Sequence, residues 1–469
     1  MTRRRFTRGG HEGPAHRSLL SAGGPSRGGR VRRPRLARAR WAVLLAAVSL
    51  AATASPDRGS SQERSGPHGM DAYRKAVGAM REKHYDEAVV HLEAVLAAAP
   101  SHPGVMAALA RASLAAGKPE AALSWLDRAV SLGGGLEALR DDALVKLLET
   151  AGGRAIKGRA DALRQPAGSM EAAFRVAERD LIPEGIAYDP ATRSFFLGSI
   201  RKRKIVRIGP DGRVSDFVPS KRDGLLAVLG MKVDPRRRVL WAASEASESM
   251  IDGTPGETGR SAVCAYDLGS GKLIGVYRTP PEATRHLFND LVVDSAGDVL
   301  VTDSEEGTVY AIPKRTGRLE RLFPAGTWDY PNGIALSADQ RTAYVAHAWG
   351  VSLVDRTTGR MRELEAPAGV TLAGIDGLVR DGRTLIAVQN GFEPMRVAAF
   401  ELNDSGDRVE SARTLARSHP DFDIPTTGVV AGGAYCFIAN SQLAAFTPDG
   451  KIFPPERLHD VVVLRTPLR

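Results

Sequence analysis

Short apolar runs separated by turn residues fill the chain from about residue 174 to its end. Runs of Val, Ile, Leu, Phe and Tyr alternate with Gly, Asp, Pro and Ser, and no helical period joins them. This pattern is typical of short β-strands connected by tight turns. We therefore predict an all-β domain over 174–469.

A repeated unit organises this region. Six times, one residue followed by a glycine or an aspartate precedes an apolar run, and five of the six leading residues are polar. In chain order the leading residues are Glu184, Leu229, Asn289, Asn332, Asp376 and Thr427. A turn dipeptide, for example Asp211-Gly212, follows each of them in phase. Two markers in phase over six units predict a six-bladed β-propeller of four-stranded blades. We expect the ring to close by pairing between strands near 174–176 and 461–464.

A different pattern precedes the propeller. Tyr85-Asp86-Glu87-Ala88 recurs 34 residues later as Pro119-Glu120-Ala121-Ala122, with apolar positions matching between the two copies. Paired amphipathic helices with this period are the signature of tetratricopeptide repeats. We predict an all-α tetratricopeptide-like module over 70–165. Such a module offers a groove for a partner protein, or it serves as a packing element, and the sequence leaves both alternatives open.

The N-terminus reads as a targeting segment. Residues 1–40 contain twelve Arg and one Glu, and an apolar stretch follows from Trp41 to the small-residue end Ala52-Thr53-Ala54. We predict a signal peptide or N-terminal anchor over 1–54, a linker over 55–69 and an exported protein, periplasmic or secreted. We expect no membrane span beyond this segment.

Composition limits the classes of partner. The net charge of +10 is confined to the leader, so the rest of the chain is close to neutral and gives no electrostatic reason to bind nucleic acid. The chain has two cysteines, Cys264 and Cys436, which fall in non-adjacent repeat units. We expect both to be buried thiols rather than a disulfide.

The repeat starts point to a metal site. In a propeller the first strand of each blade lines the central channel, so the six leading residues meet at one end of the channel. Carboxylate and amide oxygens from Glu184, Asn289, Asn332 and Asp376 suit a hard divalent cation. Ca²⁺ is the ion we expect, with Mg²⁺, Mn²⁺ and Zn²⁺ as alternatives.

These motifs resemble those of a known family. Pro183-Glu184-Gly185, Asn289-Asp290, Pro331-Asn332-Gly333 and Asp376-Gly377 are similar to motifs of the regucalcin/gluconolactonase family, also called the senescence-marker-protein family, which includes luciferin-regenerating enzyme. The resemblance implies that Glu184, Asn332 and Asp376 are metal ligands. It also implies that Asn289 contacts the substrate or a metal-bound water. Members acting on sugar lactones carry an Arg two residues before this Asn, whereas Leu287 stands there in this chain.

Loops between second and third strands should return to the same end of the channel. Two of them carry Asp303 and His347, which we take, with Asn289, as substrate-binding candidates.

Two functions follow from these observations. The first is a metal-dependent hydrolase of a lactone or related ester, in which a metal-activated water attacks the carbonyl and Asp376 acts as general base. The second is an exported binding or scaffold protein whose propeller holds a structural cation while the helical repeats dock a partner.

Overall fold

The structure, a computed structural model, describes residues 69–254, 256–280, 284–447 and 450–468. The predicted signal or anchor segment and all but the last residue of the predicted linker lie outside this part of the chain. Among the described helices, none is long and apolar enough to cross a membrane.

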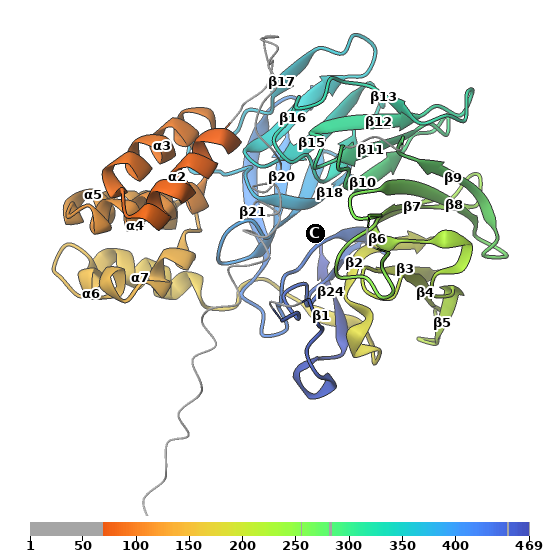
Figure 1. The fold of residues 1–469 in the computed structure, drawn as a ribbon, viewed down its shortest axis with the longest axis horizontal. Coiled ribbons are helices and arrows are strands. Elements are labelled where there is room, and N and C mark those ends of the chain that lie inside the picture. Colours follow the sequence, from red (N-terminus) through yellow and green to blue (C-terminus); the bar gives the residue numbers. More distant parts are fainter. Residues whose placement is uncertain (1–68, 255, 281–283, 448–449, 469) are drawn as a thin grey trace, which may run out of the picture. The chain divides into compact units, whose positions relative to one another are not determined.

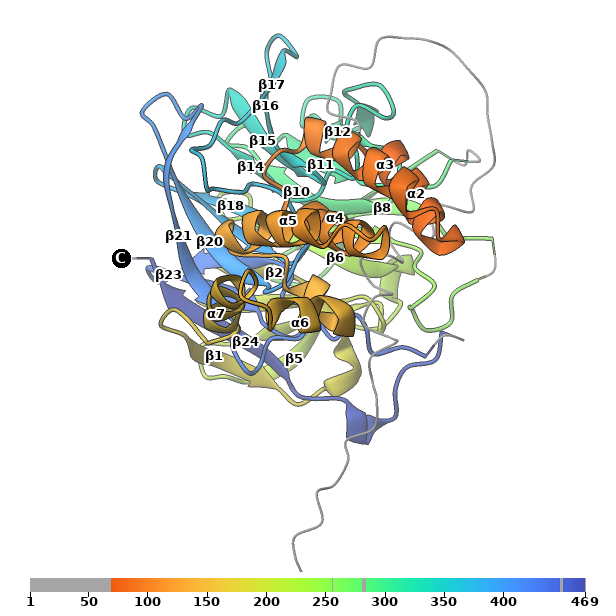
Figure 2. The same ribbon diagram turned by 90° about the vertical axis from the view of Figure 1, so that its left-hand side faces the viewer.

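The helical module contains six α-helices within the described residues. They are α2 (Met70–Glu82), α3 (Tyr85–Ala98), α4 (Pro103–Ala115), α5 (Pro119–Ser131), α6 (Asp142–Leu148) and α7 (Arg154–Leu163). Helices α4 and α5 each begin at a proline, which suits the first helical position because its missing N–H would have no helical partner there. Figure 2 shows α2 to α5 stacked side by side, as the repeat period predicts.

The described residues that follow form six four-stranded sheets arranged around a common centre (Figure 1), so the predicted propeller is confirmed. Blade one contains β2 (Pro183–Asp189), β3 (Ser194–Ser199), β4 (Lys204–Ile208) and β5 (Val214–Val218). Blade two contains β6 (Ala227–Asp234), β7 (Val239–Glu245), β8 (Ser261–Asp267) and β9 (Leu273–Arg278). Blade three contains β10 (Phe288–Val293), β11 (Val299–Asp303), β12 (Thr308–Ile312) and β13 (Glu320–Arg321).

Blade four contains β14 (Ile334–Leu336), β15 (Thr342–His347), β16 (Gly350–Asp355) and β17 (Met361–Glu363). Blade five contains β18 (Ile375–Asp381), β19 (Thr384–Gln389), β20 (Arg396–Leu402) and β21 (Val409–Arg417). Blade six joins β22 (Gly428–Ala431), β23 (Ala434–Ile438) and β24 (Val461–Pro467) to β1 (Glu171–Val176).

Blade six closes the ring in the predicted way. Its outermost strand, β1, comes from the start of the propeller and pairs antiparallel with β24. Phe174 lies opposite Val463, and Val176 lies opposite Val461. Because the first and last strands of the domain share one sheet, opening the ring requires breaking this ladder.

Glycines allow the inner strands to approach one another closely. A Cβ on Gly333 would lie 2.5 Å from the carbonyl oxygen of Asp376, and one on Gly185 would lie 1.9 Å from that of Leu229. Neither glycine has a positive φ, so these residues are not turn glycines. The residue after each of these two leading residues is small because the next blade occupies the space that a side chain would need.

Both cysteines are buried free thiols, as predicted. Cys264 lies in β8 of blade two and Cys436 in β23 of blade six, where each packs among apolar side chains.

Candidate metal centre at the mouth of the propeller

The starts of the inner strands form a continuous ring. The Gly333 N–H donates to the Asp376 carbonyl at 2.9 Å, and the Gly377 N–H donates to the Thr426 carbonyl at 3.2 Å. The hydroxyl of Thr427 donates to the Glu184 carbonyl at 2.6 Å, which joins blade six to blade one. We call this end of the channel the mouth, defined by Glu184, Leu229, Asn289, Asn332, Asp376 and Thr427.

Two carboxylates are buried together at the mouth. Glu184 is 4% exposed and Asp376 is 8% exposed. Burial, with the charges of Asp376 and Asp290, raises the pKa of Glu184 well above its usual value. Burial also raises the pKa of Asp376 to about 7, although the amides of Asn390 and Asn332 oppose the rise. Confining two anions in a poorly solvated space is unfavourable unless a positive charge lies between them.

The oxygen atoms left without partners fit a cation. Within the described residues, Glu184 Oε2 and Asn332 Oδ1 are buried and have no hydrogen-bond partner. Asp376 Oδ2 accepts a hydrogen bond of 2.5 Å from the Asn390 amide, which orients the carboxylate. Buried oxygens without donors are rare in folded proteins and often mark a ligand site. Glu184, Asn332 and Asp376 therefore suit a hard divalent ion, as the family resemblance implies.

Asn289 is held beside this group by neighbouring strands. Its side-chain nitrogen donates to Ser304 Oγ at 3.0 Å, and Ser304 donates to the Pro331 carbonyl at 2.5 Å. The two bonds fix Asn289 against the segment that carries Asn332. Asn289 is 5% exposed, so its amide is a fixed group at the mouth.

A second set of ionisable groups, which we call the rim, was not predicted from the sequence. It comprises Glu245, Arg285, Glu305 and Tyr330. Burial and the charge of Glu305 raise the pKa of Glu245 to about 7, and Arg285 opposes this rise. Burial and the charges of Glu305, Glu245, Asp376 and Glu184 raise the pKa of Tyr330, so the rim adjoins the mouth.

The positions of the rim carboxylates carry a signal in the sequence. Glu245 is the last residue of β7 and Glu305 follows β11, so both leave a second strand at the mouth end. The expectation that such loops return to the mouth selected Asp303 but passed over Glu305, two residues later.

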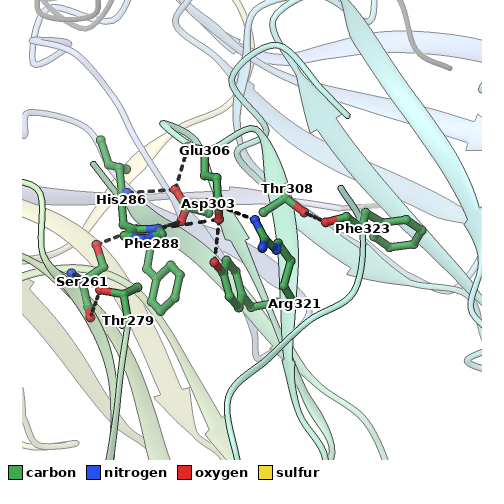
Figure 3. A network of polar contacts seen from close by, with 11 residues as sticks. Ser261, Thr279, His286, Phe288, Asp303, Glu306, Thr308, Arg321 and Phe323 are labelled. Carbon is green, nitrogen blue, oxygen red and sulfur yellow. Dashed lines mark hydrogen bonds and ion pairs between the residues drawn. The ribbon is translucent and has the colours of Figure 1, made fainter. Parts of the chain in front are cut away.

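Asp303 belongs to a buried network of polar contacts (Figure 3). Its Oδ2 contacts His286 Nδ1 at 2.6 Å, and its Oδ1 accepts the N–H groups of Leu287 at 2.9 Å and Glu306 at 3.1 Å. Asp303 is 0% exposed. The structure therefore places this predicted substrate contact where it holds the chain leading into Asn289.

His286, Asp303 and Glu306 form a second group that could hold a metal. Their ligand atoms lie within 4.8 Å of one another. The same atoms already carry short contacts, since Glu306 Oε2 accepts the Tyr310 hydroxyl at 2.5 Å and Glu306 Oε1 pairs with Arg321 at 2.6 Å. An ion at this position would have to displace the bond between His286 and Asp303. The mouth is the better candidate, because its oxygens need no such rearrangement.

His347 is not brought to the mouth group. It is 1% exposed, and its Nε2 lies 3.2 Å from both Ser352 Oγ and Glu363 Oε2, in the third and fourth strands of blade four. Those contacts direct its ring along the blade.

Comparison with known families identifies both modules. Residues 182–382 match the SMP-30/Gluconolactonase/LRE-like region, and residues 79–146 match the tetratricopeptide repeat. A search of curated proteins finds no match.

Solved structures with a similar fold include the following three proteins. A gluconolactonase from Xanthomonas campestris is 17% identical, with 64% of this chain and 89% of that chain covered and a TM-score of 0.44. A calcium-binding protein, regucalcin, from Agrobacterium tumefaciens is 17% identical, with 65% and 97% covered and a TM-score of 0.44. A virginiamycin B lyase from Staphylococcus aureus is 11% identical, with 65% and 100% covered and a TM-score of 0.42.

The family matches and the arrangement of strands agree with each other. The chain therefore carries an SMP-30/gluconolactonase/LRE-like region within its propeller, preceded by a tetratricopeptide repeat.

Proposed function

We propose that the protein is a metal-dependent hydrolase of a lactone or related ester, with its reaction centre at the mouth. The observation that carries the proposal is the burial of two carboxylates, Glu184 and Asp376, at one end of the channel. Within the described residues, two buried oxygens there, Glu184 Oε2 and Asn332 Oδ1, accept no hydrogen bond. Glu184, Asn332 and Asp376 would hold the ion. Because every atom that would ligate the ion is an oxygen, we propose Ca²⁺ as the ion, with Mg²⁺ and Mn²⁺ as alternatives.

When bound, the ion would polarise the substrate carbonyl and lower the pKa of water. The side chains then have distinct tasks. Asp376, whose carboxylate is oriented by Asn390, accepts the proton of the attacking water and returns it to the leaving alkoxide as the acyl C–O bond breaks. Asn289, fixed by Ser304, orients the water or the substrate. Arg285 and Tyr330 at the rim bind parts of the substrate away from the reacting carbonyl, a task that Leu287 cannot perform.

Hydrolysis of a panel of lactones and aryl esters, before and after chelation, tests this function. We expect turnover that is lost on chelation, restored by Ca²⁺ or Mn²⁺, and reduced at least about 100-fold in Asp376→Ala. The matched control is Asp381→Ala, an exposed carboxylate at the other end of the same strand. Bound metal with no turnover across the panel would overturn the enzyme proposal and favour the binding or scaffold function.

Export and a protein partner for the helical repeats are also proposals. Fractionation of cells expressing the full chain tests export, since the exported protein should lack residues before about position 55.

A further inference from the structure

Helix α2 is anchored on the loop that leads to the mouth. Asp329 Oδ2 accepts the N–H groups of Gly69 at 2.8 Å and Met70 at 3.0 Å, and also the Trp349 indole N–H at 2.7 Å. A carboxylate at a helix N-terminus satisfies backbone donors that lack helical partners and interacts favourably with the helix dipole. The next residue, Tyr330, belongs to the rim and has a φ of 56°, which is unusual for an aromatic residue.

Apolar packing and polar contacts extend this junction. Trp349, at the turn between β15 and β16, is 8% exposed and belongs to the apolar core of α2, α3 and α4. Its ring lies 6.4 Å from that of Tyr73 and 5.8 Å from that of His102. On blade five, the Glu393 carbonyl accepts the Leu136 N–H at 2.9 Å. Both Trp349 and Glu393 lie on loops that follow second strands, so the helices dock at the mouth end of blades four and five.

Arg74 lies one helical turn beyond the anchored end of α2. The first turn of α2 is hydrogen-bonded to Asp329, which directly precedes the rim residue Tyr330. In agreement with this position, the charge of Arg74 opposes the rise in the pKa of Glu305 that burial causes. The ion pair of Arg74 with Asp71, at 3.1 Å, joins side chains that are 40% and 75% exposed. Exposed pairs of this kind contribute little, so Arg74 can exchange Asp71 for another acceptor at low cost.

We propose that helix α2 forms one wall of the substrate site and that Arg74 is a specificity-determining residue that binds a carboxylate of the substrate. This inference rests on the proposed function, because its kinetic test requires lactone turnover. A guanidinium group only donates hydrogen bonds, and its planar fork matches a carboxylate. The helical module is then part of the site, in addition to any role in binding a partner.

Two substrates and three variants test the specificity. The full-length protein is assayed with a lactone bearing a carboxylate and with the same lactone bearing a carboxamide. We expect Arg74→Ala to raise KM for the carboxylate lactone about 10-fold with kcat little changed, and to leave the carboxamide lactone unaffected. Arg74→Lys should recover part of the preference, and the neighbouring Lys75→Ala should change neither substrate. An unchanged preference in Arg74→Ala, with turnover intact, would overturn the proposal.

A second measurement does not depend on catalysis. Because Cys264 and Cys436 are buried, a nitroxide label can be attached to Arg74→Cys alone. Mn²⁺ bound at the mouth should then broaden the nitroxide spectrum, and adding Glu184→Ala should abolish the broadening. Manganese bound without any broadening would place α2 away from the mouth, even if the enzyme proposal held. Broadening without lactone turnover would instead confirm the position of α2 and contradict the proposed function.

Discussion

At the scale of single residues, the mouth combines groups that destabilise one another when no cation is bound. Asp376 has a pKa of about 7 in the folded protein, against a usual value of 3.8. The folded state therefore holds a proton that the unfolded state has released between these values, so stability falls as the pH rises from about 4 to 7. Glu245, also with a pKa of about 7, contributes in the same direction.

The stability of the metal-free protein should therefore depend on pH. After chelation, the free energy of unfolding should be lower at pH 8 than at pH 5, by on the order of a few kcal/mol. Asp376→Asn should reduce this difference, because the variant carries no proton to lose. Denaturant unfolding at the two pH values measures both quantities. If the free energy of unfolding changed equally between the two pH values in wild type and in Asp376→Asn, the raised pKa of Asp376 would not be the cause of the pH dependence.

Asp303 is predicted to be structural. Removing its carboxylate leaves His286 and the N–H groups of Leu287 and Glu306 without this buried acceptor. We expect Asp303→Ala to lower the free energy of unfolding by about 3 kcal/mol or more. The control is Asp404→Ala, whose side chain is 93% exposed and should cost under about 0.5 kcal/mol. Similar unfolding midpoints for the two variants would contradict the role assigned to Asp303.

The sequence identified residues at the mouth better than residues around it. Glu184, Asn289, Asn332 and Asp376 share a position in a repeat, so the repeat itself selected them. Arg285 occupies no repeated position, and the pairing of β10 with β11 within blade three brings it close to Glu305. His347 and Asp303 were chosen only because their loops were expected at the mouth end of the channel. The position of a loop does not determine where a side chain on it points.

At the scale of secondary-structure elements, the inner strands depend on glycines that face a neighbouring blade. Gly333→Ala would bring a methyl group to 2.5 Å from the Asp376 carbonyl oxygen. We expect a loss of about 1–3 kcal/mol in the free energy of unfolding, with weakened metal binding because Asp376 must shift. Circular dichroism melts and metal titration measure the two effects.

The control for this variant is a glycine with open space. Gly158 lies in α7, and nothing approaches within 4 Å of the position that a methyl group would take there. Gly158→Ala should stabilise the protein by about 0.5–1 kcal/mol, because alanine favours helix. If Gly333→Ala were as well tolerated, close approach would not explain the repeated glycine.

The repeat predicted where these strands begin, but it did not show why a glycine follows the leading residue. Neither Gly185 nor Gly333 has a positive φ, so a tight turn does not explain them. The contact that requires a glycine is made by the next blade, so it cannot be predicted from the neighbouring residues in the sequence.

At the scale of the whole molecule, Trp349 joins the two modules. It belongs to the propeller in sequence and to the helical core in space. Trp349→Ala should lower the unfolding temperature of the helical module and separate its transition from that of the propeller, at a cost of about 3–5 kcal/mol. Calorimetry of the full chain detects this, and Val90→Ala, at a residue 62% exposed, is the control. A single unshifted transition would contradict a shared core.

The two modules were predictable from the sequence because each has its own period. Their junction was not, since Gly69 and Asp329 are 260 positions apart and each resembles an ordinary surface residue. The sequence left open whether the helical module packs on the propeller, and the structure shows that its first described helix is anchored beside the mouth.

The central claim is that Glu184, Asn332 and Asp376 hold a divalent ion. Equilibrium dialysis of chelated full-length protein against Ca²⁺ or Mn²⁺, followed by elemental analysis, tests it most directly. We predict one ion per chain in wild type and in His286→Ala, and loss of that ion in Glu184→Ala. Wild type without a stoichiometric ion, or an ion retained in Glu184→Ala and lost in His286→Ala, would contradict this claim.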